Sequence, residues 1–197
     1  MGLHPGSVKE NYEKDLIEIE NWLKKERFVA VGETGIDLYW DDKYKEQQLE
    51  AFREQVRMAK YYSLPIIIHH RNAFDEVYQI VSEENNEQLN GVFHCFTGTL
   101  EEANRIIELG FTLGIGGVVT FKNTHLREVI KEIDLSNIVL ETDSPYLAPA
   151  PKRGKRNESA YILYIAEVVA SVFNIPLNDF LEVVTNNSKQ LFNISDS

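Results

Sequence analysis

LPIIIHHR, residues 64–71, is the stretch of sequence that decides the fold. Its apolar residues are consecutive rather than alternating with polar ones, and a polar pair, His69 and His70, ends the run. Continuous apolarity of this kind favours a strand that is buried on both faces, as strands are in parallel sheets. Helical periodicity flanks the run at residues 43–62 and 73–83, so the stretch is typical of the strand in a βα unit.

The same pattern recurs along the chain. Four further short apolar runs are separated by segments with helical spacing of apolar residues, and the runs lie at 28–31, 91–96, 111–117 and 138–140. The remaining helices are expected at 9–27, 100–109, 124–133, 158–173 and 178–193. A repeat of about 25 to 50 residues suits βα units. The sequence therefore predicts an α/β fold with a parallel sheet, as a barrel or as a doubly wound sheet.

The composition limits the class of protein. The chain has 197 residues, 43% of them hydrophobic, which suffices for a buried core and argues against disorder. Its net charge of −11 is unlike that of a duplex-DNA binder, although a local basic patch or bound metal ions can attract nucleic acid. No apolar run of membrane-spanning length and no secretory signal are present, and Cys95 is the one cysteine. We expect a cytoplasmic protein without a membrane partner.

Polar residues that end the apolar runs carry the chemistry. They are two carboxylates and two imidazoles, on Glu33, His69, His94 and Asp143. Because the carboxyl ends of parallel strands meet at one edge, these side chains are expected to lie close together. Imidazole nitrogens and carboxylate oxygens form a ligand set for a divalent cation such as Zn²⁺ or Mn²⁺. The sequence therefore predicts a metal centre that activates water for hydrolysis.

A basic loop follows Asp143. Lys152, Arg153, Lys155 and Arg156 form the one dense cluster of cations in this acidic chain. The cluster is either a solvated loop or a phosphate-binding loop beside the metal centre, and its position favours the second.

Two further groups have open interpretations. Tyr39 and Trp40 either stack on a base or pack against the next helix. Arg71, two residues after His69, either contacts substrate or pairs with an acidic neighbour.

Taken together, these motifs resemble those of the TatD-like metal-dependent hydrolases. The segments that carry the resemblance are GETGID (32–37), LPIIIHHRNA (64–73), GVFHCFTG (91–98), LETDSPYL (140–147) and the basic loop, and they occur in the family's order. The opening GLHPG also resembles a family segment. The resemblance runs from residue 1 to about residue 193. It implies a (β/α)8 barrel of the TIM-barrel type and a nuclease that hydrolyses phosphodiester bonds in DNA.

The resemblance also implies roles for individual residues. Glu33 would be the bridging carboxylate, and His69 and His94 would complete one metal site with it. Asp143 would bind a second metal and take a proton from the attacking water, so Glu33 and Asp143 are the expected catalytic residues. Phosphate contacts are expected from Arg71, Arg153, Lys155, Arg156 and Asn157. The expected cofactors are Mg²⁺, Mn²⁺ or Zn²⁺, two ions in the full-length family.

One family feature is absent. The family begins with a strand that carries an HxH pair of ligands, and no two histidines of this chain have that spacing. We therefore expect a single, N-terminally truncated domain over residues 1–197, a partial barrel that lacks about the first two to three of its βα units. Such a chain keeps ligands for one metal. Its open strand edges, near Val29 and Ile138, predict self-association.

The predicted function is that of a divalent-metal-dependent deoxyribonuclease of the 3′–5′ exonuclease type, acting on single-stranded DNA or strand ends. Two alternatives remain. The first is a non-catalytic remnant that binds a metal or nucleic acid, because the HxH pair is absent. The second is a hydrolase of another ester or an amide, because this barrel carries many chemistries.

Overall fold

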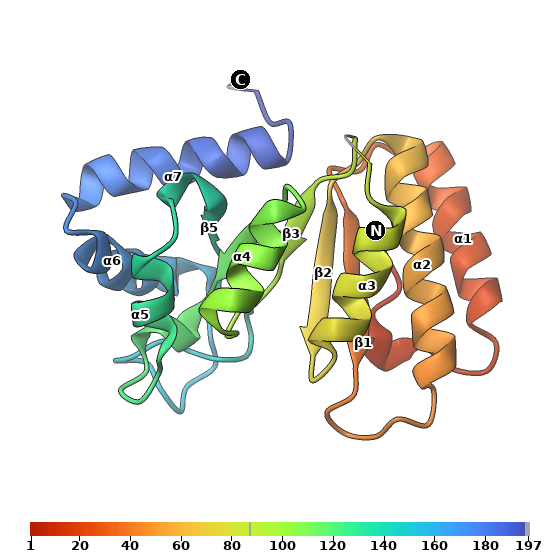
Figure 1. Ribbon diagram of the computed structural model, residues 1–197, viewed down its shortest axis with the longest axis horizontal. Coiled ribbons are helices and arrows are strands. Elements are labelled where there is room, and N and C mark those ends of the chain that lie inside the picture. Colours follow the sequence, from red (N-terminus) through yellow and green to blue (C-terminus); the bar gives the residue numbers. More distant parts are fainter. Residues whose placement is uncertain (87, 196–197) are drawn as a thin grey trace. The chain divides into compact units, whose positions relative to one another are not determined.

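The computed structural model (Figure 1) describes residues 1–86 and 88–195. The chain forms two compact units, Met1–Phe93 and His94–Ser197. Both units combine parallel strands with helices, so the predicted α/β class with parallel strands is confirmed.

In the first unit, the residues that the structure describes form three parallel strands. Its elements in chain order are η1 (Pro5–Ser7), α1 (Tyr12–Lys25), β1 (Val31–Asp37), α2 (Lys45–Tyr62), β2 (Ile66–Arg71), α3 (Phe74–Glu84) and β3 (Gly91–Phe93). β1 pairs with β2, and β2 pairs with β3, both in parallel. The helices α1 and α2 run side by side, and α2 packs against β1 (Figure 1).

The core of the first unit lies between α2 and the strands. Phe52 and Val56 on α2 are fully buried, as are Ile66 and Ile68 on β2. Burying a side chain of this size contributes about 1.5–3 kcal/mol each relative to exposure, so the apolar faces of α2 and β2 hold this unit together. Ile67, between the two buried isoleucines, is half-buried, so one face of β2 is more deeply covered than the other.

The first predicted strand was misplaced. The run at 28–31 was expected to be a strand that ends before Glu33, but β1 begins at Val31 and Glu33 lies inside it. Val29 is 59% exposed, whereas Ala30 and Val31 are buried, so the run is buried only where it approaches β1. The position of β1 is set instead by main-chain pairing with β2. A Cβ on Gly35 would lie 1.9 Å from the carbonyl oxygen of His69, its partner on β2, so only glycine permits this approach.

The described residues of the second unit, 94–195, form two parallel strands and four α-helices. Its elements are α4 (Leu100–Glu108), β4 (Thr112–Ile115), η2 (Gly117–Thr120), α5 (Leu126–Lys131), η3 (Leu135–Asn137), β5 (Ile138–Leu140), η4 (Ser159–Tyr161), α6 (Ile162–Phe173) and α7 (Leu177–Leu191). β4 pairs with β5 in parallel. α6 packs against η2, α5 and α7, and α7 also packs against β5.

Local sequence explains where α4 begins. Thr99 accepts a hydrogen bond from the Glu102 backbone N–H, and the Glu102 side chain accepts one from the Thr99 N–H. This capping box satisfies two N–H groups that would otherwise lack partners at the helix start. α4 thus begins directly after the loop that follows His94, the first residue of this unit.

Residues 1–86 and 88–195 contain five strands, fewer than the eight of a complete barrel. Within this described part, no single helix is long and apolar enough to cross a membrane. One bent pair, Ser159–Phe173 with Leu177–Leu191, meets the length and composition criteria only when its two members are taken together.

Candidate metal centre

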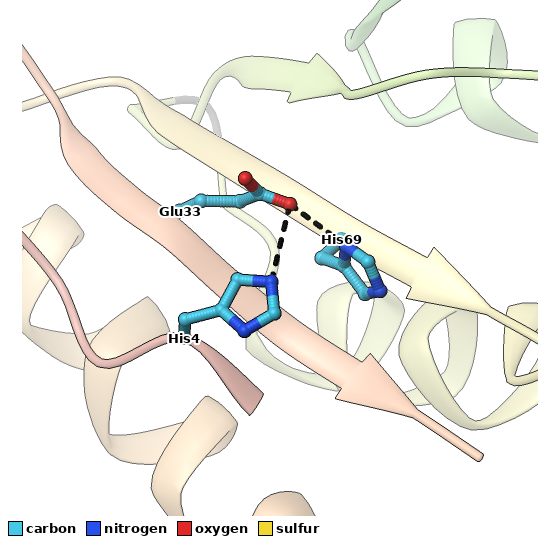
Figure 2. A group of neighbouring side chains, drawn as sticks. All are labelled: His4, Glu33 and His69. Carbon is cyan, nitrogen blue, oxygen red and sulfur yellow. Dashed lines mark hydrogen bonds and ion pairs between the residues drawn. The ribbon is translucent and has the colours of Figure 1, made fainter. Parts of the chain in front are cut away.

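The first cluster of candidate ligands lies in the first unit. Figure 2 shows His4, Glu33 and His69 converging from the N-terminal segment, β1 and β2. The Glu33 Oε1 atom lies 2.7 Å from His69 Nδ1 and 3.7 Å from His4 Nε2. One ligand atom from each of the three side chains can lie within 4.8 Å of the others, so the group is able to hold a metal ion. The structure thus brings Glu33 and His69 together as predicted.

His69 lies between two carboxylates. Its Nδ1 faces Glu33, and its Nε2 lies 3.0 Å from Oδ2 of Asp37. A neutral imidazole carries one N–H and can donate to only one of them. The lone pair of the other nitrogen then faces a carboxylate oxygen, which is repulsive unless a cation intervenes. A second proton on the ring, or a metal ion bound by His69 and Glu33, removes this repulsion, so the donor set fits a divalent cation.

Asp37 has the geometry of a residue that orients a ligand. Histidines that bind metals usually donate their other N–H to a carboxylate, which fixes the ring and its tautomer. The Asp37 side chain is 13% exposed, and its second oxygen accepts the backbone N–H of Tyr39 at 3.0 Å. Asp37 therefore holds the ring so that Nδ1 faces Glu33.

His4 plays a different part. Its Nδ1 accepts a hydrogen bond of 3.0 Å from the backbone N–H of Gly6. The hydrogen-bond network therefore assigns the proton of the neutral ring to Nε2, the atom that faces Glu33. His4 presents an N–H donor to this cluster in the geometry observed, and it would act as a ligand only after giving up the Gly6 contact.

The second cluster lies in the second unit. His94 Nδ1 lies 2.7 Å from Glu141 Oε2, and His94 Nε2 lies 3.5 Å from Asp143 Oδ1. The other Glu141 oxygen accepts the backbone N–H of Cys95 at 2.8 Å. His94, Cys95 and Glu141 form the second group whose ligand atoms can lie within 4.8 Å of one another. Imidazole, thiolate and carboxylate are all ligands that zinc accepts.

The structure brings His94 and Asp143 together, as expected for ligands that follow parallel strands. His94 follows β3, and Glu141 and Asp143 follow β5. Asp143 adopts a positive φ of 53°, in the left-handed region where aspartate is among the residues found most often. The predicted grouping of His94 with Glu33 joins residues of different units, and it stays a prediction.

Arg71 is exposed at the end of β2, where its guanidinium carbon lies 3.5 Å from the centroid of the Tyr39 ring. In the basic loop, Arg153 lies over the Phe121 ring at 4.0 Å. The side chains of Lys155 and Arg156 are exposed. These cations are therefore accessible to an anionic ligand, as the prediction of phosphate contacts requires.

Asn157 is buried beneath the basic loop. Its amide N–H groups donate to the backbone carbonyls of Thr142 and Tyr146, on either side of Asp143. Its side-chain oxygen accepts the backbone N–H of Glu158. These contacts are with the chain itself, so Asn157 holds the turn that carries Asp143.

Four residues of the two clusters were not assigned to the metal centre from the sequence: His4, Asp37, Cys95 and Glu141. Each stands inside a quoted motif, within four residues of a predicted ligand or in the opening GLHPG segment. A lone polar residue in a motif does not reveal which neighbour its side chain faces. That information comes from the strand pairing that sets His69 beside Glu33 and Asp37.

Comparisons of this chain with a family model, with known proteins and with solved structures agree with one another. A family model described as TatD related DNase matches residues 1–193. "Uncharacterized metal-dependent hydrolase YabD" of Bacillus subtilis (strain 168) is 42% identical over 196 residues, which cover 99% of this chain and 77% of that protein. "Uncharacterized metal-dependent hydrolase YcfH" of Escherichia coli (strain K12) is 36% identical over 197 residues, 100% of this chain and 74% of that protein.

A solved structure is also similar. The crystal structure of YJJV, a TatD homolog from Escherichia coli K12, matches with a TM-score of 0.93 and 31% identity, over 99% of this chain and 76% of that one. The expected N-terminal truncation, with its missing βα units, is not borne out, because the family model matches from residue 1 onward. The chain spans about three quarters of the length of these relatives.

Proposed function

Because the chain belongs to the TatD-related DNase family of metal-dependent hydrolases, we propose that it hydrolyses phosphodiester bonds of DNA, as a 3′–5′ exonuclease acting on single strands or strand ends. The observation that carries the proposal is the pair of imidazole–carboxylate clusters, Glu33 with His69 and His94 with Asp143. We further propose that residues 1–197 act as one hydrolase domain, since the family match includes both units.

The metal that these clusters fit would supply an activated water molecule near neutral pH and would neutralise charge on the phosphate. Glu33 and His69 would hold it in the first unit, with Mg²⁺, Mn²⁺ or Zn²⁺ as candidates. His94 and Asp143 would form the second site, and Glu141 would contact Nδ1 of His94, the ring nitrogen that faces away from Asp143. Asp37 orients His69 through its hydrogen bond and does not itself need to touch the substrate.

The remaining roles follow from hydrogen-bonding capacity and charge. Asp143 is the proposed acceptor of the proton from the attacking water, since an ionised carboxylate is an acceptor only. His4 presents its Nε2–H for an oxygen of the phosphate, a role that suits the tautomer fixed by Gly6. Arg153, with the exposed Lys155 and Arg156, supports the proposal because these cations would neutralise the DNA backbone.

The test is hydrolysis of single-stranded DNA labelled at its 5′ end, with each of the three metals and with a chelator. We expect metal-dependent shortening from the 3′ end, which is lost in Glu33→Gln. The matched control is Glu18→Gln, which removes an exposed carboxylate on α1 of the same unit and leaves activity unchanged. A decrease on the order of 100-fold or more is expected for Asp143→Asn, as for loss of a general base.

Elemental analysis of the purified protein completes the test. Absence of bound metal after loading would overturn the ligand assignment. One bound metal without turnover would refute the nuclease proposal and support the non-catalytic alternative. Metal-dependent cleavage of an ester or amide without cleavage of DNA would support the other alternative.

A further inference from the structure

Three side chains at the ends of β1 and β2 are not used by the proposed metal chemistry: Tyr39, Trp40 and Arg71. We propose that they form an aromatic platform on which one nucleobase of a single-stranded DNA substrate stacks. The inference rests on the proposed function, because it specifies how the same site recognises its substrate. It adds a base-contacting subsite to the first metal cluster.

The platform is built from ring contacts. The Arg71 guanidinium lies over the Tyr39 ring at 3.5 Å from the centroid and 5.8 Å from that of Trp40. The two rings meet edge to face, with centroids 4.8 Å apart and an interplanar angle of 88°. Trp40 is nevertheless 80% exposed and Tyr39 is 48% exposed, so both residues keep surface that a ligand can reach.

The positive charge of Arg71 favours an anionic ligand on the platform. Within residues 1–86 and 88–195, its guanidinium forms no ion pair with a carboxylate. The sequence alternative, a pairing with an acidic neighbour, is therefore not observed in this part of the chain. An unpaired cation stacked on exposed rings, in a chain of net charge −11, complements a ligand that is both aromatic and anionic. A nucleotide of a single strand has both properties, whereas paired bases in a duplex hide their faces.

Backbone and side-chain hydrogen bonds fix the platform to the first metal cluster. Asp37 and Arg71 are register partners in the β1–β2 pair, and the backbone N–H of Leu38 donates to the Arg71 carbonyl at 3.0 Å. The Asp37 carboxylate accepts the Tyr39 N–H with one oxygen and faces His69 with the other. One carboxylate therefore sets both the imidazole and the loop that carries the rings. A base stacked on the platform would therefore lie next to a phosphodiester group of the same strand that is bound at the first metal cluster.

The test measures binding separately from catalysis. The probe is a short oligothymidylate with phosphorothioate linkages, which resist hydrolysis, and the comparison probe is an abasic strand of equal length. For Trp40→Ala we expect the Kd for oligothymidylate to rise about tenfold, equivalent to about 1.4 kcal/mol, within the range for one stacked base. The Kd for the abasic strand should stay the same, because its backbone charge is retained.

Tyr61→Ala is the matched control. Tyr61 is also 80% exposed and makes an edge-to-face contact with its neighbour Tyr62, but it lies on α2. Its substitution should leave both Kd values unchanged. A second readout is fluorescence: the chain has two tryptophans, so in Trp22→Phe the emission comes from Trp40 alone. Stacking of thymine should quench that emission, and the abasic strand should not.

The outcomes separate the two proposals. Equal Kd values for wild type and Trp40→Ala, or equal loss of binding for both probes, would refute the platform whether or not DNA is hydrolysed. Undetectable binding of oligothymidylate by the wild type would also overturn it. Base-dependent binding and quenching without any hydrolysis would support the platform and refute the nuclease proposal.

Discussion

Asp37 offers the sharpest test of how the first cluster works. The structure gives its carboxylate two partners: the imidazole of His69 and the backbone N–H of Tyr39, both at 3.0 Å. If its main role is to orient His69 for a metal, then changing Asp37 should weaken metal binding although Asp37 lies outside the candidate ligand group. We consider two variants, Asp37→Asn, which keeps an acceptor but loses the charge, and Asp37→Ala, which loses both.

The expected magnitude follows from burial and charge. The Asp37 side chain is 13% exposed, so solvent screens its contact with His69 only in part. A hydrogen bond to a charged group contributes about 1.5–3 kcal/mol. Because each 1.4 kcal/mol is about a factor of ten, metal affinity should fall by about 10-fold in Asp37→Asn and about 100-fold in Asp37→Ala. This range agrees with the roughly 10–100-fold effect of residues that orient metal ligands.

The assay is a titration with Mn²⁺ by calorimetry and with Zn²⁺ in competition with a chromophoric chelator. Asp41→Asn and Asp41→Ala are matched controls. Asp41 lies in the loop that follows Asp37 and also accepts a backbone N–H two residues onward, from Lys43 at 3.1 Å, but it faces no imidazole. These variants control for loss of the local turn, and they should bind metal like the wild type.

Two results would refute this reasoning. One is metal affinity in both Asp37 variants equal to that of the wild type within error. The other is an equal loss in the Asp37 and Asp41 variants, which would attribute the effect to the loop and not to His69.

Two further predictions concern stability. Asn157→Ala removes the donors that bind the Thr142 and Tyr146 carbonyls, so it should lower the free energy of unfolding by about 1–3 kcal/mol in urea titrations, and an unchanged value would contradict its role in holding the turn. In the first unit, burial alone would raise the pKa of the Glu84 carboxyl, but hydrogen bonds from Arg57 and a second cation on α2 outweigh burial and lower it. A carboxyl whose pKa is lowered by folding stabilises the folded state fully at pH values above its ordinary pKa, near 4.5. This stabilisation is lost as the pH falls through the lower pKa of the folded state. Urea unfolding at several pH values should therefore show Glu84→Gln less stable than wild type at pH 7, with a difference that shrinks in acid; a constant difference would refute this.

The sequence was most informative where apolarity was continuous. The run at 66–68 identified β2, and the helices around it lie close to their expected positions. Prediction failed at β1 because its central residues include glycine, glutamate and threonine. Thr34 and Gly35 are nevertheless buried, since parallel pairing with β2 and the cover of α2 stabilise this segment irrespective of its hydropathy.

The amino-acid sequence by itself determined the α/β class and the types of residue available for a metal centre. Only the tertiary structure decided which of them meet: Glu33 and Asp37 on either side of His69, and Glu141 and Asp143 around His94. The reason is that a strand sets the direction of each side chain, whereas pairing in register and the turns after the strands set which neighbour it reaches. Motif spacing carries the first kind of information and not the second.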